Sequence, residues 1–354
     1  MKRALVAMSG GVDSSVSAFL MKEAGFDCTG VTMRLFDNED AGMEREKSCC
    51  SLDDVEDARA VANRLGIPYF VFNFKADFKR CVIDRFIEAY ECGATPNPCI
   101  DCNRFLKFER LYRRAREIEC DYIATGHYAR IEKSGGRFLL KKAKDLTKDQ
   151  SYVLYSLTQE QLAHTKFPLG EFEKSEVRKI AEEHGFVNAK KHDSQDICFV
   201  PDGDYAKIIE LHTGKSYPHG NFVGIDGKIL GEHKGIIRYT IGQRKGLGLA
   251  LPEPLYVCEK RIDTNEVVLG RNEDLFSREF NVTDINWIAF DAPPEKFRAS
   301  AKIRYRQKEQ PAEIIKDGEN KVHVVFDEPQ RAITSGQAAV FYDGDTVVGG
   351  GTII

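Results

Sequence analysis

The sequence has no long apolar run, and this absence limits the kind of protein it can be. A helix that spans a membrane needs about 20 consecutive apolar residues, and the 354 residues contain no such run. The chain opens directly on a predicted strand, Lys2–Met8, without the charged and apolar segments of a signal peptide. We therefore expect a cytoplasmic protein with no membrane partner.

An excess of positive charge is also absent. The chain has 51 Lys and Arg residues against 55 Asp and Glu residues, for a formal net charge of −4. Binding to nucleic acid must therefore depend on local basic patches rather than on the overall charge. Two stretches are locally basic, Arg104–Arg116 and Lys296–Lys308, and the second contains Tyr305, which could stack on a base. Each stretch could also be an ordinary solvated face.

A glycine-rich loop near the start lacks the signatures of two common nucleotide-binding folds. Residues 9–15 read S-G-G-V-D-S-S and follow the apolar run Ala4–Met8, with neither a Walker A lysine nor a G-x-G-x-x-G pattern. A strand, two glycines and a helix starting at Ser14 or Ser15 would direct N–H groups, hydroxyls and the positive end of a helix to one point. The sequence predicts a phosphate site of another class here.

Strand and helix signals alternate through the first 200 residues. This alternation is typical of an α/β domain with a doubly wound, mostly parallel sheet. Ligands bind such sheets outside the carboxyl ends of the strands, where the glycine-rich loop, Met33 and Thr125–His127 can meet. The expected strands are Lys2–Met8, Cys28–Phe36, Tyr69–Phe74 and Tyr122–Thr125, and the expected helices are Ser14–Ala24, Leu52–Leu65, Phe78–Glu91, Arg104–Ile118 and Glu176–Gly185.

The pattern changes after about residue 200, where helical periodicity fades and glycine becomes frequent. Short alternating strands separated by turn residues follow from Glu279, which predicts a small antiparallel barrel. We expect three domains: a catalytic α/β domain over 1–200, a small central domain over 201–275 and a C-terminal β-barrel over 276–354.

Ten cysteines are present, but a second C-x-x-C that would complete a closed zinc site is missing. In a reducing compartment these cysteines do not form a disulfide framework. Cys198 follows polar residues and is a candidate for chemistry, although a core position would also suit it. No role follows from the sequence for the adjacent pair Cys49 and Cys50.

Cys99 and Cys102 form the C-x-x-C, in a loop stiffened by two prolines. We expect a helix to start near Asn103, directly after Cys102. The helix dipole, together with Arg104 and Lys107, should then lower the pKa of the Cys102 thiol. A redox pair, part of a metal site and two buried thiols remain alternative interpretations of this loop.

The S-G-G-x-D-S loop stands among other short motifs that extend over nearly the whole chain. They are A-M-S-G-G-V-D-S at 7–14, T-P-N-P at 95–98, C-N at 102–103, K-F at 107–108, A-T-G-H-Y at 124–128, K-D-Q-S-Y-V-L at 148–154, I-C-F at 197–199, T-I-G-Q-R-K-G-L-G at 240–248, K-I-R-Y at 302–305 and S-G-Q-A at 335–338. The set resembles the bacterial tRNA-specific 2-thiouridylase family, which belongs to the PP-loop ATP pyrophosphatases. The first motif alone is shared with several synthetases, whereas the whole set is specific.

The resemblance implies a reaction on tRNA. The family makes 2-thiouridine at the wobble position, U34, in the anticodon stem-loop of certain tRNAs. ATP, with Mg²⁺, adenylates the C2 oxygen of the uracil and releases diphosphate. A persulfide sulfur, supplied by a sulfur donor protein, then displaces AMP.

The resemblance also implies roles for individual residues. Cys102 would be the nucleophile, and Cys198 would carry the persulfide and form a transient disulfide with Cys102. ATP would contact Ala7, Met8, Ser9, Gly10, Gly11, Val12, Asp13, Ser14, Met33 and Gly126. The target base and the tRNA would contact Asn97, Pro98, Cys99, His127, Lys148, Asp149, Gln150, Arg304, Tyr305 and Gln337. The small central domain over 201–275 would also contact the tRNA.

One position departs from the familiar pattern of the family, which has an aspartate three residues before the nucleophilic cysteine. Cys99 occupies that position here. Cys99, Cys102 and Cys198 could therefore ligate a [4Fe–4S] cluster and leave one iron without a protein ligand. Thiolation that depends on such a cluster is therefore an alternative mechanism to the persulfide relay. Another PP-loop ligase and a non-catalytic iron–sulfur module that binds tRNA are the remaining alternatives.

Overall fold

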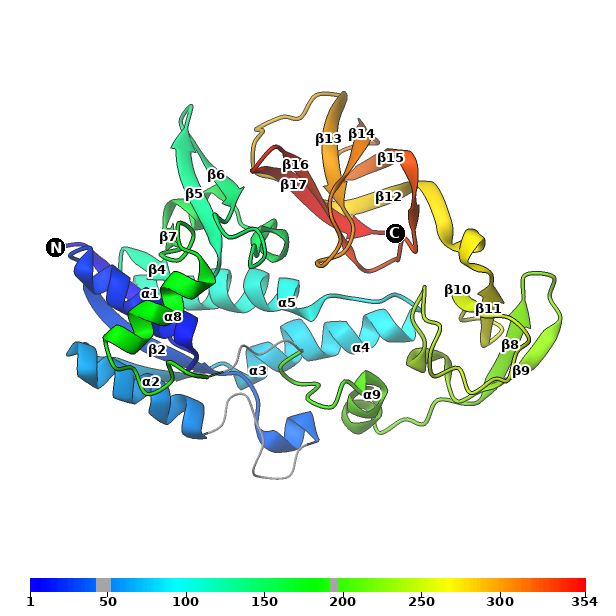
Figure 1. Cartoon of the computed structure of the whole chain (residues 1–354), viewed down its shortest axis with the longest axis horizontal. Helices are drawn as coiled ribbons and strands as arrows, with labels where there is room; N and C mark the ends of the chain where they lie inside the picture. The colour runs from blue at the N-terminus through cyan, green and yellow to red at the C-terminus, as the bar shows by residue number, and fades with distance from the viewer. Residues whose placement is uncertain (43–51, 192–196) are drawn as a thin grey trace.

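The computed structural model describes residues 1–42, 52–191 and 197–354. Figure 1 shows an α/β part that carries the N-terminus, a barrel that carries the C-terminus, and a small sheet beside the barrel. The pair Cys49 and Cys50 lies outside the described residues, as do residues 193–196 before Cys198.

The α/β part is built on a five-stranded sheet in which every pair of neighbouring strands is parallel. The strand order reverses between β1 and β4, which is where such sheets bind ligands. This confirms the predicted doubly wound fold and all four expected strands. In sheet order the strands are β3 (Tyr69–Asn73), β2 (Asp27–Arg34), β1 (Arg3–Ala7), β4 (Tyr122–Ala124) and β7 (Thr165–Lys166).

Helices cover both faces of this sheet, because alternate residues of its strands are apolar on both sides. Ala4 and Val6 of β1 pack in one buried cluster with α1 (Val12–Glu23), α2 (Leu52–Leu65) and α8 (Lys174–Glu183). Leu5 packs on the opposite face with Phe108 and Leu111. Burial on both faces is what a parallel sheet requires.

Two long helices between β3 and β4 change their hydrogen-bonding pattern along their length. The first runs through α3 (Lys75–Phe78), the π-helix η2 (Lys79–Ile83) and α4 (Asp84–Glu91). The second runs through α5 (Pro98–Asp101), the π-helix η3 (Cys102–Arg110) and α6 (Leu111–Glu117). π-helical turns are rare and occur mostly at functional sites. The second helix starts at Pro98, five residues before the expected start near Asn103.

A four-stranded sheet in the order β10-β11-β8-β9 follows in the glycine-rich region. Helix α9 (Tyr205–Thr213) precedes it and packs into one apolar cluster with Phe222 of this sheet and Phe86 of α4. The sheet therefore contacts the α/β part through side chains rather than through a shared strand. Its strands are β8 (Gly220–Gly224), β9 (Ile229–His233), β10 (Tyr256–Arg261) and β11 (Glu266–Gly270).

The C-terminal barrel is closed, because its first strand pairs with its last. The expected antiparallel barrel is confirmed. A hairpin from the α/β part also joins its sheet through the pair Lys141–Thr346, which the sequence did not reveal. The strands are β12 (Phe276–Trp287), β13 (Lys296–Lys302), β14 (Gln310–Lys316), β15 (Lys321–Arg331), β16 (Ala338–Asp343), β17 (Thr346–Ile353) and the hairpin β5 (Ala129–Ser134) and β6 (Arg137–Lys142).

Short helices complete the described fold. Among them, η4 follows the barrel-bound hairpin in the chain and is buried throughout. These elements are η1 (Asn38–Ala41), η4 (Ser151–Leu154), α7 (Gln159–Ala163), η5 (Ile236–Arg238) and η6 (Asn272–Leu275).

Three consecutive glycines in β17 allow the α/β part to pack directly against the barrel. A Cβ atom on Gly350 would lie 2.7 Å from the carbonyl oxygen of Ala339 and 2.8 Å from the ring of Tyr155. Asn286 donates to the carbonyl oxygen of Tyr155 over 2.7 Å and so fixes the same contact from β12. Only glycine fits beneath this ring.

We predict that Gly350→Ala lowers the free energy of unfolding by about 1–3 kcal/mol, the usual cost of overpacking a close contact. Urea unfolding measures the change. Thr346→Ala, on the same strand but only half-buried, should stay within about 0.5 kcal/mol of the parent. An unchanged Gly350→Ala midpoint would contradict the close packing.

Candidate active site

The loop between β1 and α1 has the geometry expected for a phosphate site. Gly10 has a φ of +76°, and α1 begins at Val12 with Gly11 as its N-cap, two residues earlier than expected. The hydroxyls of Ser14 and Ser15 each donate to the carbonyl oxygen of Gly11 over 3.0 Å. The serines of the first turn therefore fix the start of the helix. The first N–H groups of α1 have no partner within the helix and are directed to the loop.

Two glycines allow neighbouring backbone to approach this loop. A Cβ atom on Gly10 would lie 2.3 Å from the carbonyl oxygen of Asp54 in α2. A Cβ atom on Gly126, which follows β4, would lie 2.9 Å from the backbone of Asp13 and Ser14. The structure thus places the predicted ATP residue Gly126 against the loop. Met33 lies at the carboxyl end of the neighbouring strand β2.

The loop is anchored by two residues that the sequence analysis missed. Asn188 donates to the carbonyl oxygen of Gly10 and to the hydroxyl of Ser15, both over 2.9 Å, and is buried. Lys191 pairs with Asp54 at 2.5 Å and with Asp57 at 2.7 Å. The segment after α8 therefore connects the loop to α2, and no local sequence signal marks either residue.

Lys174 is a third residue missed by the sequence analysis. Its ammonium group donates to both carboxylate oxygens of Asp13, over 2.7 and 2.8 Å, and its side chain is only 10% exposed. Tyr128 donates to the same carboxylate over 2.8 Å. A lysine in the first turn of a helix opposes the helix dipole, and this anomaly was the available sequence signal. The network fixes the orientation of the Asp13 carboxylate.

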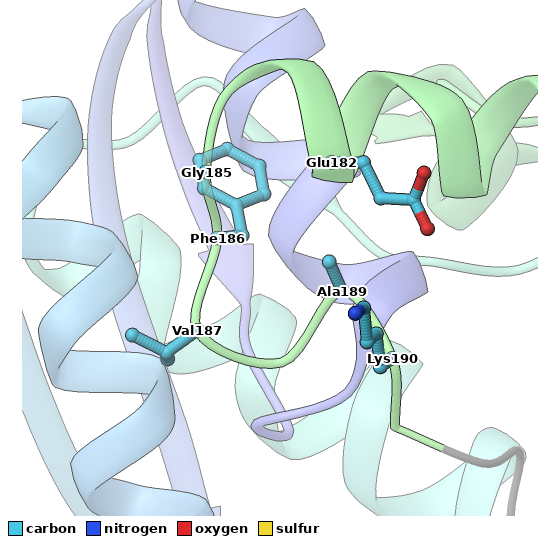
Figure 2. Close-up of a pocket in the computed structure, with 6 residues that line it drawn as sticks. All are labelled: Glu182, Gly185, Phe186, Val187, Ala189 and Lys190. Atoms are coloured by element: carbon cyan, nitrogen blue, oxygen red, sulfur yellow. The ribbon is translucent and has the colours of Figure 1, made fainter.

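An open hollow lies along the segment that carries Asn188. Figure 2 shows this segment turning away from the end of α8, with Val187 pointing away from Phe186. None of the predicted ATP residues lines the hollow, so we do not assign the nucleotide to it. Its lining residues are Glu182, Gly185, Phe186, Val187, Ala189 and Lys190.

The structure corrects the expectation for Cys102. Asn97 caps the helix by accepting from the N–H of Cys99, so Cys102 lies one turn inside the helix rather than before it. Cys102 is buried, and burial raises the pKa of its thiol to about 11, against the lowering effect of Lys107. The predicted low pKa is therefore wrong in this conformation, because desolvation of the thiolate outweighs the nearby positive charge.

Lys107 connects the two thiols to a buried histidine. Its ammonium group lies 3.4 Å from Nε2 of His127. Burial raises the pKa of both Cys99 and Cys102, and the charge of Lys107 partly opposes this rise. Burial holds the pKa of His127 well below its usual value, so the ring is neutral and accepts at Nε2 while Nδ1 donates to Thr125 over 2.7 Å. Cys99 reaches solvent, although surrounding protein raises the pKa of its thiol.

Cys198 packs against the same apolar cluster that contains Cys102. Its neighbours Ile197 and Phe199 belong to this cluster as well, and Phe199 contacts Phe86 edge to face at 5.3 Å. Cys102 lies in this cluster and Cys198 packs against it, although the two cysteines are 96 positions apart in the sequence. The cluster is large and also takes in residues of α4, α9 and the four-stranded sheet.

The barrel holds the loop before Cys99. Gln337 donates to the carbonyl oxygen of Thr95 over 2.6 Å, and the N–H of Thr95 donates to the carbonyl oxygen of Ser335 over 2.9 Å. Tyr305, which is 37% exposed, lies within electrostatic reach of both Cys99 and Asp149. Predicted tRNA residues from three distant segments therefore gather around the C-x-x-C.

Other predicted tRNA residues already have partners inside the protein. Asp149 is buried and accepts from Ala143 and Ser151, and Gln150 accepts from the N–H of Tyr128. Arg304 donates to the carbonyl oxygens of Ile241 and Ala332 and to the hydroxyl of Thr334. Contact between these residues and tRNA stays a prediction. Lys148 is half-buried and adjoins them.

The three cysteines do not form a ready site for a metal cluster. Over residues 1–42, 52–191 and 197–354, no group of three His, Cys, Asp or Glu side chains is arranged to hold a metal ion. Cys102 lies in an apolar cluster while Cys99 is exposed. The donor set in this conformation does not fit a [4Fe–4S] cluster.

Comparison with known proteins identifies the family. The model of the tRNA methyl transferase HUP domain matches residues 2–202, that of the tRNA methyl transferase PRC-barrel domain residues 206–271, and that of the aminomethyltransferase β-barrel domain residues 277–353. A tRNA-specific 2-thiouridylase MnmA from Clostridioides difficile is 54% identical over 99% of this chain and 98% of its own. The chain belongs to the tRNA-specific 2-thiouridylase family.

Two further 2-thiouridylases match along their full length. The MnmA protein of Lachnoclostridium phytofermentans is 53% identical over 100% of both chains, and that of Carboxydothermus hydrogenoformans is 52% identical over 99% of this chain and 97% of its own. The domain models are named for methyl transfer, whereas the full-length relatives are named for thiolation. Agreement over the whole length decides between the two names.

Membership in the 2-thiouridylase family bears out several expectations. The chain is a tRNA sulfurtransferase of the PP-loop class, which uses ATP and Mg²⁺, and its substrate is tRNA. The Ser9–Ser14 loop and the Asp13 carboxylate are suited to phosphates and to Mg²⁺, which prefers oxygen ligands. Within the described residues, no helix is long and apolar enough to cross a membrane.

We predict that Lys174→Met destabilises the protein by about 2 kcal/mol, because it leaves the Asp13 carboxylate without its cation. The double variant Asp13→Asn, Lys174→Met removes both charges and should recover at least half of this loss. Urea unfolding measures both variants. Lys179→Met, on the same helix with a side chain 76% exposed, serves as the control and should change little. Equal losses in the single and double variants would contradict the pairing.

Proposed function

We propose that this 2-thiouridylase thiolates the wobble uridine, U34, in the anticodon stem-loop of its tRNA substrates. The observation that carries the proposal is the PP-loop at the carboxyl end of β1. Cys102 in one apolar cluster and Cys198 packed against the same cluster support it. The full-length relatives named 2-thiouridylase support the tRNA and the product. We expect the enzyme to act in the cytoplasm.

In the first step, ATP adenylates the C2 oxygen of the target uracil. The oxygen attacks the α-phosphorus, and diphosphate leaves with the electrons of the broken bond. N–H groups of the loop and the start of α1 would stabilise the charge that develops on the phosphates. Asp13, oriented by Lys174 and Tyr128, would hold Mg²⁺ on the same phosphates. The proposed contacts are Ala7, Met8, Ser9, Gly10, Gly11, Val12, Asp13, Ser14, Met33 and Gly126.

In the second step, sulfur replaces the activated oxygen. The terminal sulfur of a Cys198 persulfide attacks C2 and expels AMP, which leaves the base joined to Cys198 through two sulfurs. The Cys102 thiolate then attacks the Sγ atom of Cys198, and the base departs with its sulfur as 2-thiouridine. A disulfide between Cys102 and Cys198 remains, and a thiol reductant reduces it. A sulfur donor protein restores the persulfide.

Burial of Cys102 fits this order of events. A thiol with a pKa of about 11 is protonated at neutral pH and is protected from side reactions. Lys107 supplies the positive charge that favours the thiolate once the site is arranged for reaction. We propose that the base is received by Asn97, Pro98 and Cys99, with Tyr305 beside them.

The remaining assignments are also part of the proposal. We infer that the tRNA contacts His127, Lys148, Asp149, Gln150, Arg304, Tyr305 and Gln337, several of which would have to exchange internal partners for RNA. We also propose domain limits of 1–200, 201–275 and 276–354.

We predict that the enzyme converts ATP to AMP and diphosphate when tRNA is present. Asp13→Ala and Ser9→Ala should abolish thiolation, because each removes a group from the phosphate loop, while tRNA affinity stays within about twofold of the parent. Chromatography of labelled ATP identifies the products. ADP as the stoichiometric product would contradict the proposal.

Cys99→Ser distinguishes the persulfide relay from a cluster-dependent reaction. The relay predicts substantial activity with a persulfide donor in protein that contains no iron. A cluster that uses Cys99 as a ligand predicts loss of activity and loss of a broad absorption near roughly 400 nm in protein purified without oxygen. Cys102→Ser and Cys198→Ser should be inactive under both mechanisms, so they serve as reference variants.

A further inference from the structure

Arg104 in η3 forms an ion pair with the barrel that has no role in the mechanism described so far. Its Nη1 and Nη2 atoms donate to the two carboxylate oxygens of Asp284 in β12, the second over 3.2 Å. The two residues are 180 positions apart in the sequence, so the pair joins the helix of the C-x-x-C to the C-terminal barrel. A bidentate pair of this kind fixes direction as well as distance.

Asp284 lies in an unusual piece of backbone. Its φ is +53°, in the left-handed region that few residues other than glycine adopt. The pairing of β12 with β17 changes register here, because Asp284 and Ile285 together lie opposite Gly351 alone. Asn320 fixes this bulge by accepting from the N–H of Ile285 over 2.8 Å. A β-bulge changes the direction of a side chain, and this one directs Asp284 to Arg104.

Stability by itself does not account for this arrangement. The side chains of Arg104 and Asp284 are 35% and 44% exposed, and an ion pair this exposed adds little to the free energy of unfolding. An aspartate in the left-handed region, in contrast, costs free energy, and such residues gather at functional sites. The pair is therefore explained better by what it positions than by the energy it supplies.

The pair is one of two contacts that hold the chain on either side of Cys102. Asp101, directly before the cysteine, has a side chain that is only 18% exposed and lies 3.5 Å from Arg85 of α4. Arg104, two residues after the cysteine, is held by Asp284. We call the ion pairs Arg85–Asp101 and Arg104–Asp284 the clamp. The clamp ties the helix to α4 on one side and to the barrel on the other.

Helix geometry couples Arg104 to the direction of the Cys102 thiol. Side chains two positions apart do not share a face of a helix. Cys102 accordingly belongs to the apolar cluster against which Cys198 packs, whereas Arg104 reaches the barrel. A rotation of the helix about its axis would move both side chains together. The position of Arg104 therefore sets how Cys102 faces the cluster.

We propose that Asp284 is a positioning residue for Cys102: by holding Arg104, it fixes the rotation of η3 that directs the thiol into the apolar cluster beside Cys198. This inference rests on the proposed attack of Cys102 on Cys198. It gives the barrel a part in the sulfur-transfer step, in addition to its contact with the loop before Cys99.

The first test measures alkylation of the full-length protein by iodoacetamide at about pH 8, without substrates, with each cysteine peptide followed by mass spectrometry. Asp284→Asn removes the charge and keeps a residue that tolerates left-handed backbone. It should speed the alkylation of Cys102 about tenfold, because a helix that is free to turn opens the thiol to the reagent. Cys28 is the internal reference, since it is also buried and burial raises the pKa of its thiol to about 11.

The second test measures thiolation. Asp284→Asn should lower kcat about tenfold, since a misplaced reacting group costs rate, while the KM for ATP and the affinity for tRNA stay within about twofold of the parent. Addition of Arg104→Met to Asp284→Asn should cause no further loss, because both changes break the same pair. Asp327→Asn is the matched control and should behave as the parent, because Asp327 accepts from both Nη atoms of Arg298 within the barrel.

Equal acceleration of Cys102 and Cys28 in Asp284→Asn would indicate general loosening of the fold and would overturn the proposal, as would an unchanged kcat. A loss of ATP or tRNA affinity in place of the loss in kcat would also contradict it. The alkylation test needs no thiolation. If Cys102→Ser still thiolates tRNA, the proposed function fails, whereas faster alkylation of Cys102 in Asp284→Asn would still support positioning by Asp284.

Discussion

The backbone of the loop after β1 is the constraint on which the rest of the site depends. Gly10 has no room for a side chain because α2 approaches it, and Gly126 in the turn after β4 has none because the loop approaches it at Asp13. Asn188 then fixes the carbonyl oxygen of Gly10, and Lys174 fixes the carboxylate of Asp13. Groups from four separate segments therefore meet at one loop of six residues, so the phosphate site exists only when the whole α/β part is folded.

The thiol site illustrates a balance between burial and charge. Helix capping by Asn97 moves Cys102 into the apolar interior, where desolvation raises the pKa of its thiol more than Lys107 lowers it. His127 is neutral and holds the ammonium group of Lys107 without cancelling its charge. A buried, protonated thiol beside the positive charge of Lys107 suits an enzyme that must deliver sulfur only to an activated base.

The barrel contributes to the site although it lies at the other end of the chain. It fixes the loop before Cys99 through Gln337, it accepts the hairpin of the catalytic part at β17, and it holds the 240–248 loop through Arg304. The barrel thus makes specific polar contacts with both other parts of the chain, one of them at the loop before the C-x-x-C.

The sequence by itself determined the fold class, the phosphate loop and the family, because strand alternation, the S-G-G-x-D-S spacing and the other motifs are local patterns. The start of the helix at Pro98 was not predicted, although Asn97 as N-cap followed by proline at the first helical position is itself a local signal. Only the tertiary structure decided that Cys102 is buried and that Lys174, Asn188 and Lys191 anchor the loop. Burial and long-range pairing depend on residues far apart in the chain, and no local pattern records them.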